Sequence, residues 1–137
     1  MLKAIEKALL LQEMDLLRFA SADHLMLLAE AGREETYKKR GLMVRTGSPA
    51  STLYLLLRGR VASEETEGQS LEKTAVNFHS CLAGEENTAG CVCLEDCTVL
   101  AIERTDLLAL LAGEPELSLA LLKYFTSGPA IRPMPKD

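Results

Sequence analysis

The chain has 137 residues, of which 47% are hydrophobic and 26% are charged, a composition typical of one folded domain and not of a disordered segment. Fifteen basic and 20 acidic residues give a net charge of −5, which argues against a nucleic-acid-binding surface. The longest stretch without a charged residue, Thr46–Leu57, has 12 residues. A membrane-spanning helix needs about 20 apolar residues, so we expect no transmembrane segment. The acidic Glu6 argues against a secretory signal peptide.

Residues 2–32 are predicted to form a helical hairpin. In its first half, apolar residues recur at close to the 3.6-residue helical period, with charged residues between them. The hydroxyl of Ser21 is placed to cap the second helix, and Gly32 suits its end. His24, at the start of that helix, is expected on the surface.

The helical period ends near Thr36, where short apolar runs separated by glycines begin, a pattern typical of strands joined by tight turns. The run Leu53–Leu57 is apolar on both faces and therefore predicts a central, well-covered strand. The polar segment 64–70 is expected to be a hairpin tip. Further strands are predicted over residues 71–78, 89–94 and 98–102.

The helical period returns at Thr105, which we expect to cap a helix, and Pro115 fits the first position of a second one. This layout predicts a single α+β domain built around an antiparallel barrel or roll. The predicted parts are an N-terminal helical hairpin (1–34), a β-roll (35–104), C-terminal helices (105–126) and a flexible tail (127–137).

Residues 37–61 resemble the first half of the cyclic nucleotide-binding domain family, with glycines at three turns and an apolar-Tyr-apolar strand before the third glycine. Residues 94–107 resemble the last strands of that family and the helix after them, and residues 114–117 continue the match. The likeness covers roughly residues 15–125. It implies an antiparallel double-stranded β-helix, a jelly-roll-like barrel of about eight strands, as in cyclic AMP receptors and protein kinase A regulatory subunits. A cupin-like or unrelated barrel is the structural alternative.

The resemblance also implies a ligand site, called the phosphate-binding cassette in this family. Its short helix begins with Phe-Gly-Glu, and a Pro-Arg-Ser/Thr-Ala segment follows. The glutamate takes a ribose hydroxyl, while the arginine and the helix amides hold the cyclic phosphate. The corresponding residues here are Phe78, His79, Ser80, Cys81, Leu82, Asn87, Thr88 and Ala89.

The cassette departs from the family pattern at the residues that contact the ligand. His79 stands in place of the glycine, Ser80 in place of the glutamate and Asn87 in place of the arginine. The acidic Glu85 and Glu86 precede Asn87, and the segment is about two residues shorter than in the family. A desolvated phosphate that loses its cation loses a few kcal/mol of binding free energy, so we interpret the cassette as degenerate.

The function that we expect is that of a non-catalytic regulatory or protein-interaction domain, without normal cyclic nucleotide affinity and without a cofactor. The alternative is a functional cyclic AMP or cyclic GMP sensor with a divergent pocket. The expected partner is another protein or the rest of a larger regulated chain, such as a membrane carrier, and a homodimer through the flanking helices is possible. Only about a dozen residues follow the last helix, so we expect no DNA-reading domain and no direct nucleic-acid binding.

Four cysteines fall within 17 residues, which does not resemble a disulfide framework, so we expect a reducing cytoplasmic environment. We expect them to act as small core residues. A metal site and a cysteine nucleophile activated by His79 are the alternatives, and we predict neither a metal nor a catalytic residue. The cysteines are Cys81, Cys91, Cys93 and Cys97.

Overall fold

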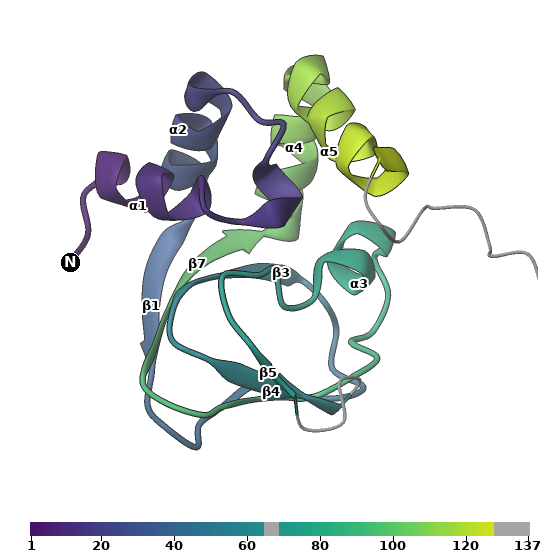
Figure 1. Ribbon diagram of the computed structural model, residues 1–137. Helices are drawn as coiled ribbons and strands as arrows, with labels where there is room; N and C mark the ends of the chain where they lie inside the picture. The colour runs from purple at the N-terminus through teal and green to yellow at the C-terminus, as the bar shows by residue number, and fades with distance from the viewer. Residues whose placement is uncertain (65–68, 128–137) are drawn as a thin grey trace, which may run out of the picture.

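The computed structural model describes residues 1–64 and 69–127, which form a β-roll with helices packed against one side of it (Figure 1). The predicted tip 64–70 and the predicted tail 127–137 lie largely outside these residues, although Ser127 ends the last helix. In chain order the elements are α1 (Ala4–Leu11), η1 (Asp15–Leu17), α2 (Ala22–Ala31), β1 (Arg33–Tyr37), β2 (Leu42–Val44), β3 (Thr52–Arg58), β4 (Val61–Ser63), β5 (Ser70–Leu71), α3 (Phe78–Ala83), β6 (Cys91–Cys93), β7 (Cys97–Glu103), α4 (Arg104–Gly113) and α5 (Pro115–Ser127).

The strands form two antiparallel sheets, one in the order β1-β7-β3 and the other in the order β2-β6-β4-β5. This confirms the predicted α+β class, with seven strands in the described part of the chain where about eight were expected. The apolar side chains between the two sheets include Leu56, Val61 and Val99. A second and larger core lies between the helices and the three-stranded sheet.

Strand β3 is buried on both faces, as its sequence predicts, because it separates these two cores. Leu53, Leu55 and Leu57 pack with the helices, whereas Leu56 faces the interior of the roll. Strand β3 pairs with β7 on one edge, and on its other edge Leu55 forms an antiparallel bridge with Ala75, so β3 has a neighbour on both sides, as expected of a central strand. A strand at this position can be apolar on both faces because the helices cover the face that is turned away from the roll.

The expected tight turns follow β2 and β3, where Gly47 and Gly59 have φ angles of +85° and +100°. At the first turn, the residue with positive φ is Arg40, at +74°, and not Gly41. Gly41 is required for space, because a Cβ atom there would lie 2.9 Å from the carbonyl oxygen of Lys38.

The strand predicted over residues 71–78 was wrong in extent. Strand β5 ends at Leu71, and the chain then crosses to β3, where the amide of Leu56 donates to Thr74 O at 2.8 Å and the amide of Val76 donates to Tyr54 O at 2.9 Å. Helix α3 begins at Phe78. Within this crossing segment, Ala75 and Val76 pack against the two cores, and such half-buried apolar residues are also typical of a regular strand.

The cap of α2 and the start of α5 agree with the predictions, whereas the cap of α4 and the burial of His24 do not. Ser21 caps α2 by accepting a hydrogen bond from the amide of His24, and Pro115 is the first residue of α5. Helix α4 begins at Arg104 with Glu103 as its N-cap, so Thr105 is not the cap. His24 is only 8% exposed, contrary to prediction, because its ring Nε2 packs 3.8 Å from Glu114 Oε1 at the α4–α5 junction. In the described part of the chain, no helix is both long and apolar enough to cross a membrane.

Candidate functional site

A cavity of about 300 Å³ opens beside α3, the helix that lies at the edge of the roll nearest α5 (Figure 1). Its wall combines the interior of the four-stranded sheet, the crossing segment before α3, the segment before β6 and the end of α5. This is the position that the resemblance predicts for the ligand site. Its described lining is Asp15, Leu16, Val61, Ser63, Leu71, Lys73, Thr74, Ala75, Val76, Asn77, Phe78, His79, Ser80, Asn87, Thr88, Ala89, Cys91, Tyr124 and Phe125.

Two of the eight predicted site residues do not reach this cavity. Cys81 is fully buried in the core beneath α3, and Leu82 points to the outer surface of that helix. The other six line the cavity, so the fold brings both halves of the predicted cassette together: Phe78, His79, Ser80, Asn87, Thr88 and Ala89.

Asn87 is only 6% exposed, and its side-chain amide is bonded within the protein. Its Nδ2 donates to the Ser48 carbonyl oxygen at 3.2 Å and to the Ser48 hydroxyl at 3.0 Å. Its Oδ1 accepts from Nδ2 of Asn77 at 3.1 Å. Asn77 is itself buried, donates to Thr52 O at 2.9 Å and accepts from the amide of Tyr54 at 3.2 Å. The pair therefore ties α3 and the segment before β6 to β3 and to the turn that precedes it.

The charges around the cavity do not favour an anion. In the described lining, the side chains with a fixed charge are Asp15 and Lys73, and Lys73 Nζ lies 2.7 Å from Glu13 Oε1. This carboxylate raises the pKa of Lys73 by accepting its hydrogen bond and by direct attraction. Asp15 is itself paired with Arg18, whose Nη1 lies 4.0 Å from Asp15 Oδ1, so each charged side chain of the described lining already has a partner of opposite sign.

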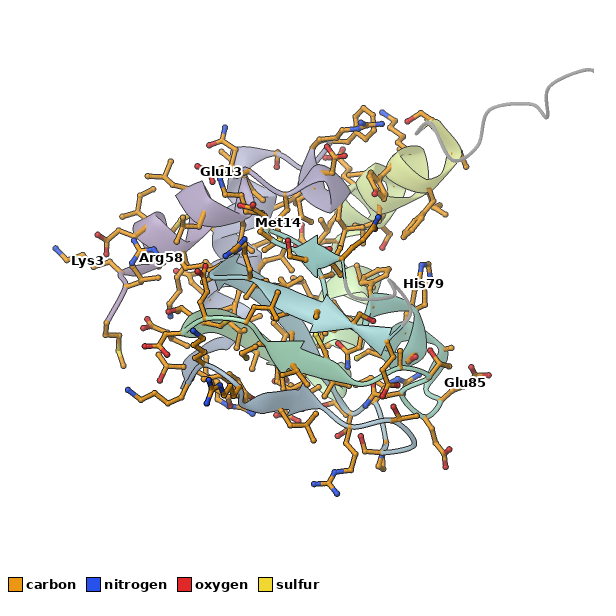
Figure 2. The ribbon with its side chains drawn as sticks, turned by 60° about the horizontal axis from the view of Figure 1, so that its bottom comes forward. Lys3, Glu13, Met14, Arg58, His79 and Glu85 are labelled. Carbon is orange, nitrogen blue, oxygen red and sulfur yellow. The ribbon has the colours of Figure 1, made fainter. Side chains whose placement is uncertain are left out.

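Neither Arg45 nor Arg60, two arginines of the roll, supplies the missing cation. Arg45 lines a second hollow of about 240 Å³, of which Asn87 is a shared wall, and it does not line the cavity. Arg60 is paired with Glu95, its Nε lying 3.7 Å from Glu95 Oε2, and it is also absent from the lining of the cavity beside α3. Figure 2 shows His79 and Glu85 at one side of the molecule, with both side chains pointing outward.

Glu64, the first residue of the acidic segment predicted to be a hairpin tip, connects the chain after β2 to the residue before β6. Glu64 Oε1 accepts hydrogen bonds from the Thr46 hydroxyl at 2.7 Å and from the Gly90 amide at 2.9 Å. These bonds lower the pKa of Glu64, the amide of Gly90 contributing most. Glu64 therefore stays ionised and fixes the backbone immediately after Ala89.

Arg104 holds the other end of α3. Its Nε donates to Cys81 O at 2.6 Å and its Nη2 to Leu82 O at 3.3 Å, so a cation caps the carbonyl end of the helix, where the helix dipole is negative. Gly84 allows this contact, because it has φ +73° and a Cβ atom there would lie 2.8 Å from the guanidinium. Since Arg104 is the first residue of α4, it links the cavity helix directly to the C-terminal helices.

Helix α5 contributes an aromatic wall. The ring of Phe125 stacks on Phe78, with centroids 5.8 Å apart and an interplanar angle of 26°, and its centroid lies 5.5 Å from that of His79. Tyr124 also lines the cavity and has the guanidinium of Arg18 at 5.5 Å from its ring. The end of α5 is therefore part of the site, although nothing in its sequence pattern distinguishes these rings from ordinary core residues.

The cysteines are buried free thiols, as the core interpretation predicts. Burial raises the pKa of Cys91 to about 11 and that of Cys93 to about 12, with the neighbouring Cys97 adding to both shifts. Burial also raises the pKa of Cys81. Such thiols are protonated and unreactive at neutral pH. Within residues 1–64 and 69–127, no group of three or more histidine, cysteine, aspartate or glutamate side chains could hold a metal ion.

Solved structures with the same fold include three of bacterial origin. A cyclic nucleotide-binding domain from Methylobacillus flagellatus KT has a TM-score of 0.75 at 18% identity, covering 89% of this chain and 75% of that one. The N-terminal domain of a transcriptional regulator from Streptomyces coelicolor A3(2) has a TM-score of 0.71 at 21% identity, covering 85% and 89%. The catabolite activator protein of Thermus thermophilus has a TM-score of 0.69 at 23% identity, covering 82% of this chain but 56% of that protein.

No match was found among curated proteins. The sequence does match the family model for the cyclic nucleotide-binding domain, over residues 34–114. That stretch contains most of the roll, the whole of α3 and the segment with Asn87, and it is more than half of the chain. This protein therefore belongs to the cyclic nucleotide-binding domain family.

Proposed function

We propose that this chain is a non-catalytic regulatory or protein-interaction domain whose cavity does not bind cyclic nucleotides with the affinity usual for its family. The observation that carries the proposal is the state of Asn87. It stands where the resemblance places the phosphate-binding arginine, and its amide is already bonded to Ser48 and Asn77 inside the protein. No other cation replaces that arginine in the described lining except Lys73, which is paired with Glu13.

The size of the effect follows from the charge of the ligand. A cyclic phosphate carries a full negative charge, and removing the charged partner of a desolvated anion costs roughly 2–5 kcal/mol. Each 1.4 kcal/mol is about a tenfold change in Kd, so a site of about 1 μM becomes one in the range of about 0.03–4 mM. Lys73 does not offset this loss, because its ammonium group is already paired with Glu13.

The proposed partner is another protein or another part of a longer regulated chain. Leu119 and Leu122 are exposed on α5, the helix that also carries Phe125 into the cavity wall, which supports transmission of a signal through this helix. The contact between Arg104 and α3 supports the same route through α4. The four buried thiols support a reducing compartment, and we propose a cytoplasmic location.

Thermal unfolding with cyclic AMP and cyclic GMP, each at about 1 mM, tests the proposal. A ligand with a Kd of about 1 μM would stabilise the fold by about 4 kcal/mol at that concentration. For a domain of this size, roughly 3 °C per kcal/mol corresponds to a rise in Tm of more than about 10 °C. With the weakened Kd given above, we expect a shift of at most about 6 °C with either nucleotide. A rise of about 10 °C would instead establish the alternative, a functional cyclic nucleotide sensor with a divergent pocket.

A further inference from the structure

The cavity beside α3 is open although its described lining offers no unpaired cation. Its volume of about 300 Å³ is at the lower end of the range for small-molecule sites, roughly 300–1,000 Å³. Asn77 and Asn87, which could have filled the space, instead turn their amides to each other and to the backbone. The fold therefore keeps a recess of ligand size at the family's ligand position while presenting no usable positive charge in it.

The wall offers apolar contacts and neutral hydrogen-bonding groups. Leu71, Val76 and the ring of Phe125, all half-buried, provide an apolar and aromatic surface suited to a flat heterocycle. Ser80 faces the cavity, and its hydroxyl has no hydrogen-bond partner among residues 1–64 and 69–127. A neutral ligand with hydroxyl groups could bond to this group without placing a charge in a site of low dielectric constant.

We propose that this cavity binds a neutral purine nucleoside in preference to the corresponding cyclic nucleotide. The inference rests on the proposed function, because it requires a site that cannot neutralise a phosphate. A nucleoside keeps the base and the ribose of the family's ligand, and it carries two neutral hydroxyls where the cyclic nucleotide carries its anionic phosphate diester. The base and the sugar can make the same contacts in both ligands, while the anion adds a desolvation cost that no unpaired cation of the described lining offsets.

Isothermal titration calorimetry with four probes measures this preference. The probes are adenosine, cyclic AMP, guanosine and cyclic GMP, and the buffer is at pH 8, above the ordinary titration range of histidine. We expect at least one nucleoside to bind with a Kd at least about tenfold lower than that of its own cyclic nucleotide, a difference of about 1.4 kcal/mol. A cyclic nucleotide that binds as tightly as its nucleoside, or the failure of both nucleosides to bind at millimolar concentration, overturns the inference.

The same titrations separate this inference from the proposed function. Tight binding of a cyclic nucleotide overturns both. No binding by any probe, or equally weak binding by a nucleoside and its cyclic nucleotide, overturns this inference and leaves the proposed function standing. Binding by a nucleoside alone supports both.

Two pairs of variants locate the site and test the role of charge. Ala89→Leu fills the cavity and should weaken nucleoside binding at least about tenfold, whereas Ala83→Leu, on the outer side of α3 and outside this lining, should leave it unchanged. Ser80→Arg introduces a cation and should shift the preference toward the cyclic nucleotide at least about tenfold. Ser80→Gln, which is neutral, should not. Each variant is first checked for a folded circular dichroism spectrum, and unchanged binding in folded Ala89→Leu would place the ligand elsewhere and refute the proposal.

Discussion

The buried amides of Asn77 and Asn87 should be energetically coupled, because each is a hydrogen-bond partner of the other. Asn87→Ala leaves one N–H of Asn77 unpaired in a buried position, which costs about 1–3 kcal/mol, and it removes the bonds to Ser48, worth about 1 kcal/mol together. We therefore expect a loss of about 3 kcal/mol in the free energy of unfolding. Asn77→Ala deprives the backbone groups of Tyr54 and Thr52 of a partner and should cost a similar amount.

The double variant should cost about 1 kcal/mol less than the sum of the single variants, because their shared hydrogen bond is lost only once and neither amide remains to be left unpaired. Urea denaturation followed by far-UV circular dichroism measures these values, since the chain contains no tryptophan. Asn87→Ala combined with Ser118→Ala is the control pair, because the Ser118 hydroxyl bonds to Leu111 O in the C-terminal helices and shares no partner with Asn87. Additivity of the asparagine pair within about 0.5 kcal/mol would refute the reasoning that Asn87 has a structural role in this network.

Two further predictions concern the helix that borders the cavity and the buried thiols. Arg104→Ala should speed amide hydrogen exchange in α3 and lower the free energy of unfolding by about 1–2 kcal/mol, because the carbonyls of Cys81 and Leu82 lose a charged donor. Arg104→Lys should recover part of the protection, and exchange in α3 equal to wild type in Arg104→Ala would contradict the assigned contact. The thiols of Cys91 and Cys93 should react with a thiol reagent at pH 8 only as fast as the protein unfolds. Because folding raises the pKa of Cys91 from about 9 to about 11, its contribution to stability is complete below pH 9 and is lost as the pH rises toward 11. Urea denaturation at several pH values should show this decline, and a smaller decline in Cys91→Ala; a rise in stability over that range would contradict the assigned burial.

Local sequence patterns were sufficient for the elements whose physics is local. The cap at Ser21, the first helical position at Pro115 and the turn at Gly59 depend on a few neighbouring residues, and the structure confirms them. The same holds for the alternation that buries both faces of β3. In each case the backbone geometry and the burial pattern are set by residues within one or two turns of the chain.

The contacts that decide what the cavity can bind depend on segments far apart in the sequence. Asn87 is only a polar residue in a loop until Ser48, 39 positions earlier, and Asn77 come to lie beside it. The tertiary structure also decided that His24 is buried, since Glu114 packs against it from the other end of the chain. A polar side chain carries no local signal that says whether water, a ligand or the protein will satisfy its hydrogen bonds, and only the folded arrangement of distant segments makes that choice.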